Sequence, residues 1–104
     1  CTRLIAAARR HYAEGGSLAA ICAAPGLVLS QIDLPEGSKF TCFDGFQDPL
    51  IAKGCLFTGA PAEKSGRIIT GRSAGHAVAF GLEILKVLKG EETVAKVSHS
   101  LYLY

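Results

Sequence analysis

The sequence predicts an α/β fold built on a doubly wound parallel sheet. Short apolar runs typical of strands alternate with amphipathic segments typical of helices along the 104 residues. The first strand-like run, residues 17–22, is apolar on both alternating faces, as a parallel strand covered by helices on both sides would be. The length fits one small domain at most.

The first half of the chain opens with an amphipathic helix. Leu4, Ile5 and Ala8 share one face of residues 2–14, and a Gly-Gly pair ends the periodicity. The elements expected over this half are a helix at 2–14, a strand at 17–22, a helix at 24–31, a loop at 33–37, a short strand at 39–43, one or two helical turns at 47–53 and a short strand at 56–58.

The second half contains the longest predicted helix. Ser73 is expected to cap its amino end, and Gly90 closes it. The elements expected here are a loop at 59–66, a strand at 67–70, a helix at 74–89, a further helix at 91–97 and a tail at 101–104 that forms an edge strand or a docking segment. The long helix is expected to bury one stripe, made of Val78, Leu82, Ile84, Leu85 and Leu88.

Cys22 stands where the first strand passes into a helix. Small residues occupy the places two before and two after it, Ala20 and Ala24, as a tight nucleophile elbow requires, and Pro25 suits the first helical turn. The amides of Ala23 and Ala24 would then point at the sulfur or at a developing oxyanion, with the helix dipole behind them. The pattern predicts a reactive thiol. The alternative, a small buried hydrophobic cysteine, fits this local pattern equally well.

Composition excludes several classes of protein. No apolar run of about 18 residues occurs, so we expect no membrane span. The net charge of +2 is too small to indicate nucleic acid or an anionic membrane as partner. Four cysteines lack a C-x-x-C pair and zinc spacing, which predicts free thiols, no metal and a reducing compartment, by default the cytoplasm. No cofactor site is indicated, and Gly71 and Gly75 are expected to permit close packing rather than to bind phosphate.

A central strand at 17–22 needs neighbours on both of its edges, and this chain supplies few. We therefore expect an N-terminal half with further βα units to accompany the chain, on the same polypeptide or on a separate one. The chain contains no Met, which also suggests a fragment or a nicked chain. Cys22 and the loop at 70–75 both follow strands, and ligands of doubly wound sheets bind at the carboxyl ends of strands.

Three segments, in this order and spacing, resemble the DJ-1/ThiJ/PfpI superfamily. They are the runs at 19–25 (AAICAAP), 37–43 (GSKFTCF) and 66–75 (GRIITGRSAG), the last followed by a long helix. The resemblance covers about the C-terminal half of a typical member. It implies a flavodoxin-like α/β sandwich of which residues 1–104 are the C-terminal portion, the N-terminal βα units being absent, and usually a homodimer.

The resemblance also implies roles for individual residues. Cys22 would be the nucleophile, the amide of Ala23 half of an oxyanion hole, and an acidic residue near the sulfur would come from the absent first βα unit. The substrate pocket would include Ala24, Phe43, Ala74 and Gly75. Where some members carry a His near the sulfur, this chain has Phe43. His76, at the start of the long helix, would be a proton carrier; the alternative, an exposed or cap-region His, is commoner for a lone histidine.

Ala23 directly after the cysteine, where other branches have His, resembles the DJ-1/ThiJ branch. That branch implies glyoxalase III activity, which turns methylglyoxal into lactate without a cofactor, together with deglycation, protection from oxidative stress and chaperone action. Its older label, thiazole monophosphate biosynthesis, has no matching residues here. The alternative is a non-enzymatic redox sensor or chaperone that acts through oxidation of Cys22. Glutamine amidotransferases also use a cysteine elbow, but the run at 99–101 lacks their His-x-Glu.

Overall fold

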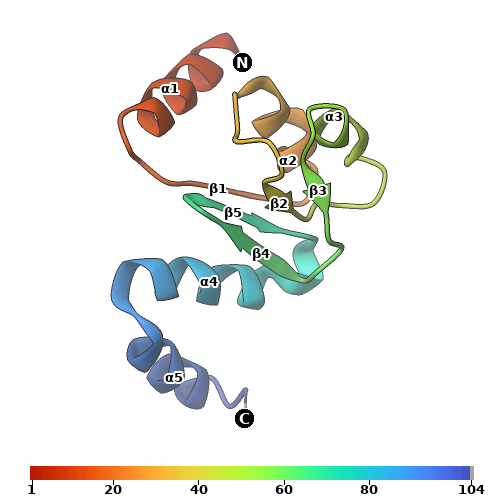
Figure 1. Ribbon diagram of the computed structural model, residues 1–104. Helices are drawn as coiled ribbons and strands as arrows, with labels where there is room; N and C mark the ends of the chain where they lie inside the picture. Colours follow the sequence, from red (N-terminus) through yellow and green to blue (C-terminus); the bar gives the residue numbers. More distant parts are fainter. Residues whose placement is uncertain (104) are drawn as a thin grey trace.

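The computed structural model describes residues 1–103 as helices arranged around a small sheet (Figure 1). The elements are α1 (Thr2–Ala13), β1 (Leu18–Ile21), α2 (Ala24–Leu27), a 3₁₀ helix (Leu29–Gln31), β2 (Lys39–Phe40), α3 (Asp48–Ile51), β3 (Leu56–Phe57), β4 (Ala62–Ser65), β5 (Ile68–Gly71), a second 3₁₀ helix (Ala74–His76), α4 (Ala77–Lys89) and α5 (Glu91–Ser100).

The main sheet has the strand order β1-β5-β4. The predicted parallel arrangement of strands is confirmed for β1 and β5, which pair directly, with Leu18 opposite Ile68 and Ile21 opposite Gly71. A second pair of two-residue strands, β2 and β3, is also parallel. The α/β class with a parallel sheet is therefore confirmed.

The prediction of a loop over residues 59–66 is wrong, because β4 occupies residues 62–65 and runs antiparallel to β5. Gly66, at a φ of 58°, starts the two-residue turn between these strands, the position at which a hairpin turn requires a positive φ. The strand is polar and lies at the sheet edge, so its composition resembles that of a loop. The sheet is thus mixed rather than wholly parallel.

Several predicted boundaries shift. The helix at 24–31 ends as α2 at Leu27 and continues as a 3₁₀ turn, and the strand at 39–43 is regular only over residues 39–40. The long helix begins with a 3₁₀ turn before α4, and α5 runs three residues past its predicted end. In the tail, residues 101–102 form a turn, residue 103 belongs to no strand, and residue 104 lies outside the described residues.

The core lies between the sheet and the face that carries α2 and α3. Its buried side chains are Leu29, Ile32, Phe40, Cys42, Leu50, Cys55 and Ile68. On the other face α4 lies across β4 and β5, and α5 folds back beyond it (Figure 1). The buried stripe expected on α4 is wrong: Val78 is 52% and Leu88 70% exposed, and no residue of α4 is buried. A stripe is buried only where a partner covers it, and the main contacts of α4 within residues 1–103 are with the narrow sheet, with α5 and with the 3₁₀ turn before it.

Among the described residues, β1 pairs with β5 alone, so its second edge is open. An apolar groove of about 350 Å³ follows this edge, between α1 and α2. Its lining residues are Leu4, Ala8, Leu18, Ala19, Ala20, Ile21, Ala24, Val28 and Leu29. In the part of the chain that is described, no helix is long and apolar enough to cross a membrane.

Candidate active site

Cys22 directly follows β1 in a strained conformation. Its φ is 66°, in the left-handed region that non-glycine residues rarely occupy. Two backbone hydrogen bonds hold it there: its N–H donates to the Gly71 carbonyl (2.9 Å), and its carbonyl accepts from the Phe43 N–H (2.7 Å). The residue is half-buried. Strain of this kind persists only where the surroundings enforce it, and it is concentrated at functional sites.

The chain beyond Cys22 turns at once into α2. Ala23 has helical dihedral angles (φ −79°, ψ −21°) and Pro25 takes the first turn. Within residues 1–103 the amide N–H groups of Ala23 and Ala24 have no hydrogen-bond acceptor. Two backbone donors beside the thiol are therefore available to an anionic oxygen. Because α2 has only four residues, its dipole adds less than the predicted longer helix would.

A close backbone contact fixes the position of α2. A Cβ on Gly26 would lie 2.0 Å from the carbonyl oxygen of Phe46, so only glycine allows the helix to approach the segment that follows β2. Gly26 and Pro25 are both buried. The turn that carries Cys22 is thus packed against backbone rather than against movable side chains.

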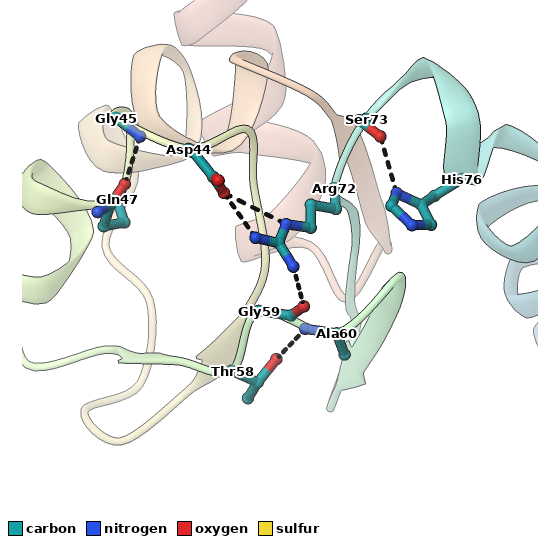
Figure 2. Close-up of polar contacts among 9 residues, drawn as sticks. All are labelled: Asp44, Gly45, Gln47, Thr58, Gly59, Ala60, Arg72, Ser73 and His76. Atoms are coloured by element: carbon teal, nitrogen blue, oxygen red, sulfur yellow. Dashed lines mark hydrogen bonds and ion pairs between the residues drawn. The ribbon is translucent and has the colours of Figure 1, made fainter.

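The segment after β2 crosses the carboxyl ends of β1 and β5. Three polar contacts join it to these strand ends: the bond from the Thr41 N–H to Thr70 Oγ1 (2.9 Å), the bond from the Phe43 N–H to the Cys22 carbonyl, and an ion pair between Asp44 and Arg72 (2.8 Å). Arg72, just beyond β5, also donates to the Gly59 carbonyl (2.7 Å; Figure 2). These polar contacts bring the carboxyl ends of β1 and β5, which are far apart in the sequence, together around Cys22.

The Asp44–Arg72 pair was not predicted. The two residues lie 28 positions apart, and neither stands in a local pattern that indicates a partner. Arg72 belongs to the loop singled out at 70–75, but the sequence offered no reason to pair it with Asp44.

The four cysteines are all free and differ in burial. Cys1 is exposed and Cys22 half-buried, whereas Cys42 and Cys55 belong to the core. Burial raises the pKa of the Cys42 thiol, and the nearby Asp44 carboxylate raises it further. Burial likewise raises the pKa of Cys55. Both core thiols are thereby kept protonated and inert at neutral pH.

The loop after β5 carries His76. Its Nδ1 lies 2.7 Å from Ser73 Oγ, and the two side chains point toward one another (Figure 2). Ser73 thus does not act as the predicted side-chain cap, because its hydroxyl binds the imidazole instead of a helix amide. Ala74 and Gly75, between them, are exposed, and His76 is half-buried.

The two glycines of this loop have different surroundings. A Cβ on Gly71 would lie 2.8 Å from the Phe80 ring and 2.9 Å from Ile21, which confirms the expected close packing near the elbow. At Gly75 the nearest atom, Ser73 Oγ, would be 3.7 Å away, so the same expectation is wrong there.

The predicted site residues are brought together only in part. Phe43 is hydrogen-bonded to Cys22 through its backbone, and its side chain is 46% exposed, with its ring centroid 6.4 Å from that of Phe46. Ala24 instead lines the groove along β1. The hydrogen bond of the His76 ring goes to Ser73. Across residues 1–103, no three His, Cys, Asp or Glu side chains are grouped as metal ligands would be.

A cysteine at positive φ between a parallel strand and a helix defines a class of flavodoxin-like α/β proteins with a cysteine elbow. Comparison with known proteins then gives the family. The model of the DJ-1/PfpI family matches residues 1–87, and the chain belongs to this family.

Three relatives illustrate the match. Protein DJ-1 homolog A of Arabidopsis thaliana is 32% identical over 103 residues, 99% of this chain and 26% of that protein. The glutathione-independent glyoxalase DJR-1.2 of Caenorhabditis elegans is 32% identical over 79 residues, 76% of this chain and 41% of that protein. The solved structure of oxidized Toxoplasma gondii DJ-1 superposes with a TM-score of 0.83 at 30% identity, covering 95% of this chain and 53% of the other. The chain therefore spans from about a quarter to about half of these relatives.

Proposed function

We propose that Cys22 is the nucleophile of a cofactor-independent site that acts on reactive aldehydes, as a glyoxalase or deglycase does, and so protects against stress. The observation that carries the proposal is the strained, half-buried Cys22 beside two amides that lack acceptors in the described chain. A relative named as a glutathione-independent glyoxalase supports the choice of substrate class.

The reaction begins when the Cys22 thiolate attacks the aldehyde carbon of a 2-oxoaldehyde such as methylglyoxal. The new C–S bond forms as the carbonyl π pair moves to oxygen, and the Ala23 N–H stabilises that oxyanion until protonation gives a hemithioacetal. Moving the C1 proton to C2 converts the adduct to a thioester of lactate, and water then hydrolyses it to lactate and free thiol. In this scheme a carboxyl group from the N-terminal portion moves the proton.

The surroundings of the thiol suit a small substrate. Phe43, Ala74 and Gly75 are exposed around the strand ends, and Ala24 lies on the helix just beyond Cys22. We assign these four residues to the pocket wall. The Asp44–Arg72 pair holds the segment that carries Phe43, so it is a positioning pair in this scheme.

The test of the nucleophile is the rate at which each thiol reacts with iodoacetamide at neutral pH in the folded protein. Cys22 should react faster than Cys42 and Cys55, which are buried, and also faster than the exposed Cys1. The comparison with Cys1 isolates activation from access. Equal rates at Cys1 and Cys22 would remove the basis for an activated thiol.

We propose that the imidazole ring of His76, which the Ser73 hydroxyl orients, transfers a proton in this site. Replacing His76→Gln should lower kcat about a hundredfold, the usual contribution of a general acid or base. Ser73→Ala should lower it less, because only the orientation of the ring changes. His11→Gln, on α1, is the matched control. Unchanged kcat and an unchanged pH profile in His76→Gln would leave the ring with a structural role only.

A second candidate function is a redox sensor or chaperone that works through oxidation of Cys22. The oxidized state of the Toxoplasma relative favours it. Cys22→Ser separates the two functions: loss of methylglyoxal consumption supports the enzyme. Peroxide-dependent sulfinate on Cys22 in a wild-type protein that shows no turnover supports the sensor.

We propose further that residues 1–104 are the C-terminal portion of one domain, completed by N-terminal βα units, and that the complete protein is a cytoplasmic homodimer. The open edge of β1 and the apolar groove beside it support the first part, because an added strand would satisfy both. Residues 1–104 expressed alone should be poorly soluble or molten. A cooperative unfolding transition of the isolated monomer would contradict this.

A further inference from the structure

A second cavity lies at the end of the sheet opposite Cys22. It has a volume of about 350 Å³ and is lined by Arg9, Tyr12, Ala13, Ile32, Asp33 and Arg67. Arg67 immediately precedes β5, and the end of α1 leads into β1, so the cavity lies at the amino ends of these strands. The four residues of β1 lie between this end of the sheet and Cys22, and an extended strand of that length spans about 13 Å.

Arg67 is fixed in position before any ligand arrives. Its Nη1 donates to the carbonyls of Tyr12 and Gly16, both at 2.6 Å, and its guanidinium carbon lies 4.1 Å from the centroid of the Tyr12 ring. Its Nε and Nη2 have no acceptor among residues 1–103. The planar guanidinium is thus hydrogen-bonded to the backbone through Nη1, while Nε and Nη2 remain available as donors.

Arg9 is held in a similar way from α1. Its Nε donates to the Gln31 carbonyl at 2.8 Å, and within the described chain both terminal nitrogens lack an acceptor. The two guanidinium groups therefore line the same cavity with their stems restrained. Restraint lowers the entropy lost when an anion binds.

The local charge is positive in spite of one carboxylate. Asp33 lies 3.9 Å from the Lys53 Nζ, which also donates to the carbonyls of Ser30 and Ile32. Among the residues that line the cavity, Arg9 and Arg67 against Asp33 leave an excess of one positive charge, and the Asp33 carboxylate is paired with Lys53 outside the lining.

We propose that this cavity binds the phosphate group of a small phosphorylated molecule between the free donors of Arg9 and Arg67. Two planar guanidinium groups can donate hydrogen bonds to several oxygens of one phosphate, which a single point charge cannot do. Ligands that react in doubly wound sheets bind at the carboxyl ends of the strands, so an anion at the amino ends is bound apart from the chemistry of Cys22.

The test is calorimetric titration of the full-length protein with pyrophosphate and with inorganic phosphate at low ionic strength. We expect binding at one site, weakened about tenfold or more in Arg9→Gln, because a charge-assisted hydrogen bond is lost. Arg10→Gln is the matched control, since it removes the same charge from the next position of α1 and Arg10 does not line the cavity. Amide NMR shifts at Gly16, Asp33 and Arg67 should move on binding.

Two results would overturn the proposal. Equal weakening in Arg9→Gln and Arg10→Gln would mean that pyrophosphate senses only the diffuse surface charge. No saturable binding of either probe in the wild type would mean that the two arginines serve only to join α1 to its neighbours. Phosphate affinity does not involve the thiol, so Cys22→Ser should bind both probes unchanged whether or not the proposed function holds.

Discussion

The strain at Cys22 predicts an unusual order of stabilities between two variants that both remove the thiol. A φ of 66° costs an L-residue about 1–2 kcal/mol, and glycine is free of this cost. Glycine loses about 0.5–1 kcal/mol relative to alanine through the greater freedom of its unfolded chain. The midpoints of these two ranges differ by about 0.75 kcal/mol, so the free energy of unfolding should be higher by about that amount in Cys22→Gly than in Cys22→Ala, although glycine is normally the less stable choice.

The assay is equilibrium urea unfolding of the full-length protein, followed by circular dichroism. Tyr102 supplies a control, because it also has a positive φ (59°) but is 91% exposed, beyond the end of α5. No packing enforces its conformation, so Tyr102→Gly and Tyr102→Ala should differ little. If Cys22→Gly is no more stable than Cys22→Ala, the turn relaxes without cost, and stored strain has no part in presenting the thiol.

Two further predictions concern packing and pH. Gly71→Ala should lower the free energy of unfolding by about 1–3 kcal/mol, because the new Cβ would lie 2.8 Å from the Phe80 ring. Gly75→Ala should leave it almost unchanged, because no atom lies so close to that position. Equal losses for the two variants in urea unfolding would contradict the assigned contacts. The raised pKa values of the buried Cys42 and Cys55 favour their neutral thiols in the folded state, so this stability is present below the unfolded pKa and is lost as the pH rises above about 9. Cys42→Ala should flatten that alkaline decline, and an unchanged slope of unfolding free energy against pH would refute it.

The fold was predictable where burial and periodicity agree. β5 is buried at all four positions, and its apolar run identified it, as the amphipathic pattern identified α1. β4 was missed because an edge strand needs no apolar run, and its pairing depends on a turn at Gly66. The stripe on α4 was correctly seen as apolar but wrongly expected to be buried. Periodicity identifies the face of a helix that can be covered, and only the rest of the fold decides whether it is.

The candidate site was predictable only where it is local. The small residues around Cys22 indicate a tight turn, and the structure has that turn with a positive φ. By contrast, the partnership of Asp44 with Arg72 depends on how β2 and β5 are arranged in space, and no spacing in the sequence encodes it. Gly71 and Gly75 look alike in sequence, yet only Gly71 is approached by a side chain from α4.

The contacts around the elbow also indicate how a change at the thiol would be transmitted. The carbonyl of Cys22 holds Phe43, the next residue pairs with Arg72, and Arg72 holds the carbonyl of Gly59, which precedes β4. A bulky adduct or an oxidised sulfur that shifts the Cys22 backbone therefore acts on a segment already joined to the far edge of the sheet. In either proposed function, these bonds would hold the Cys22 thiol in position and connect its backbone to the segment that precedes β4.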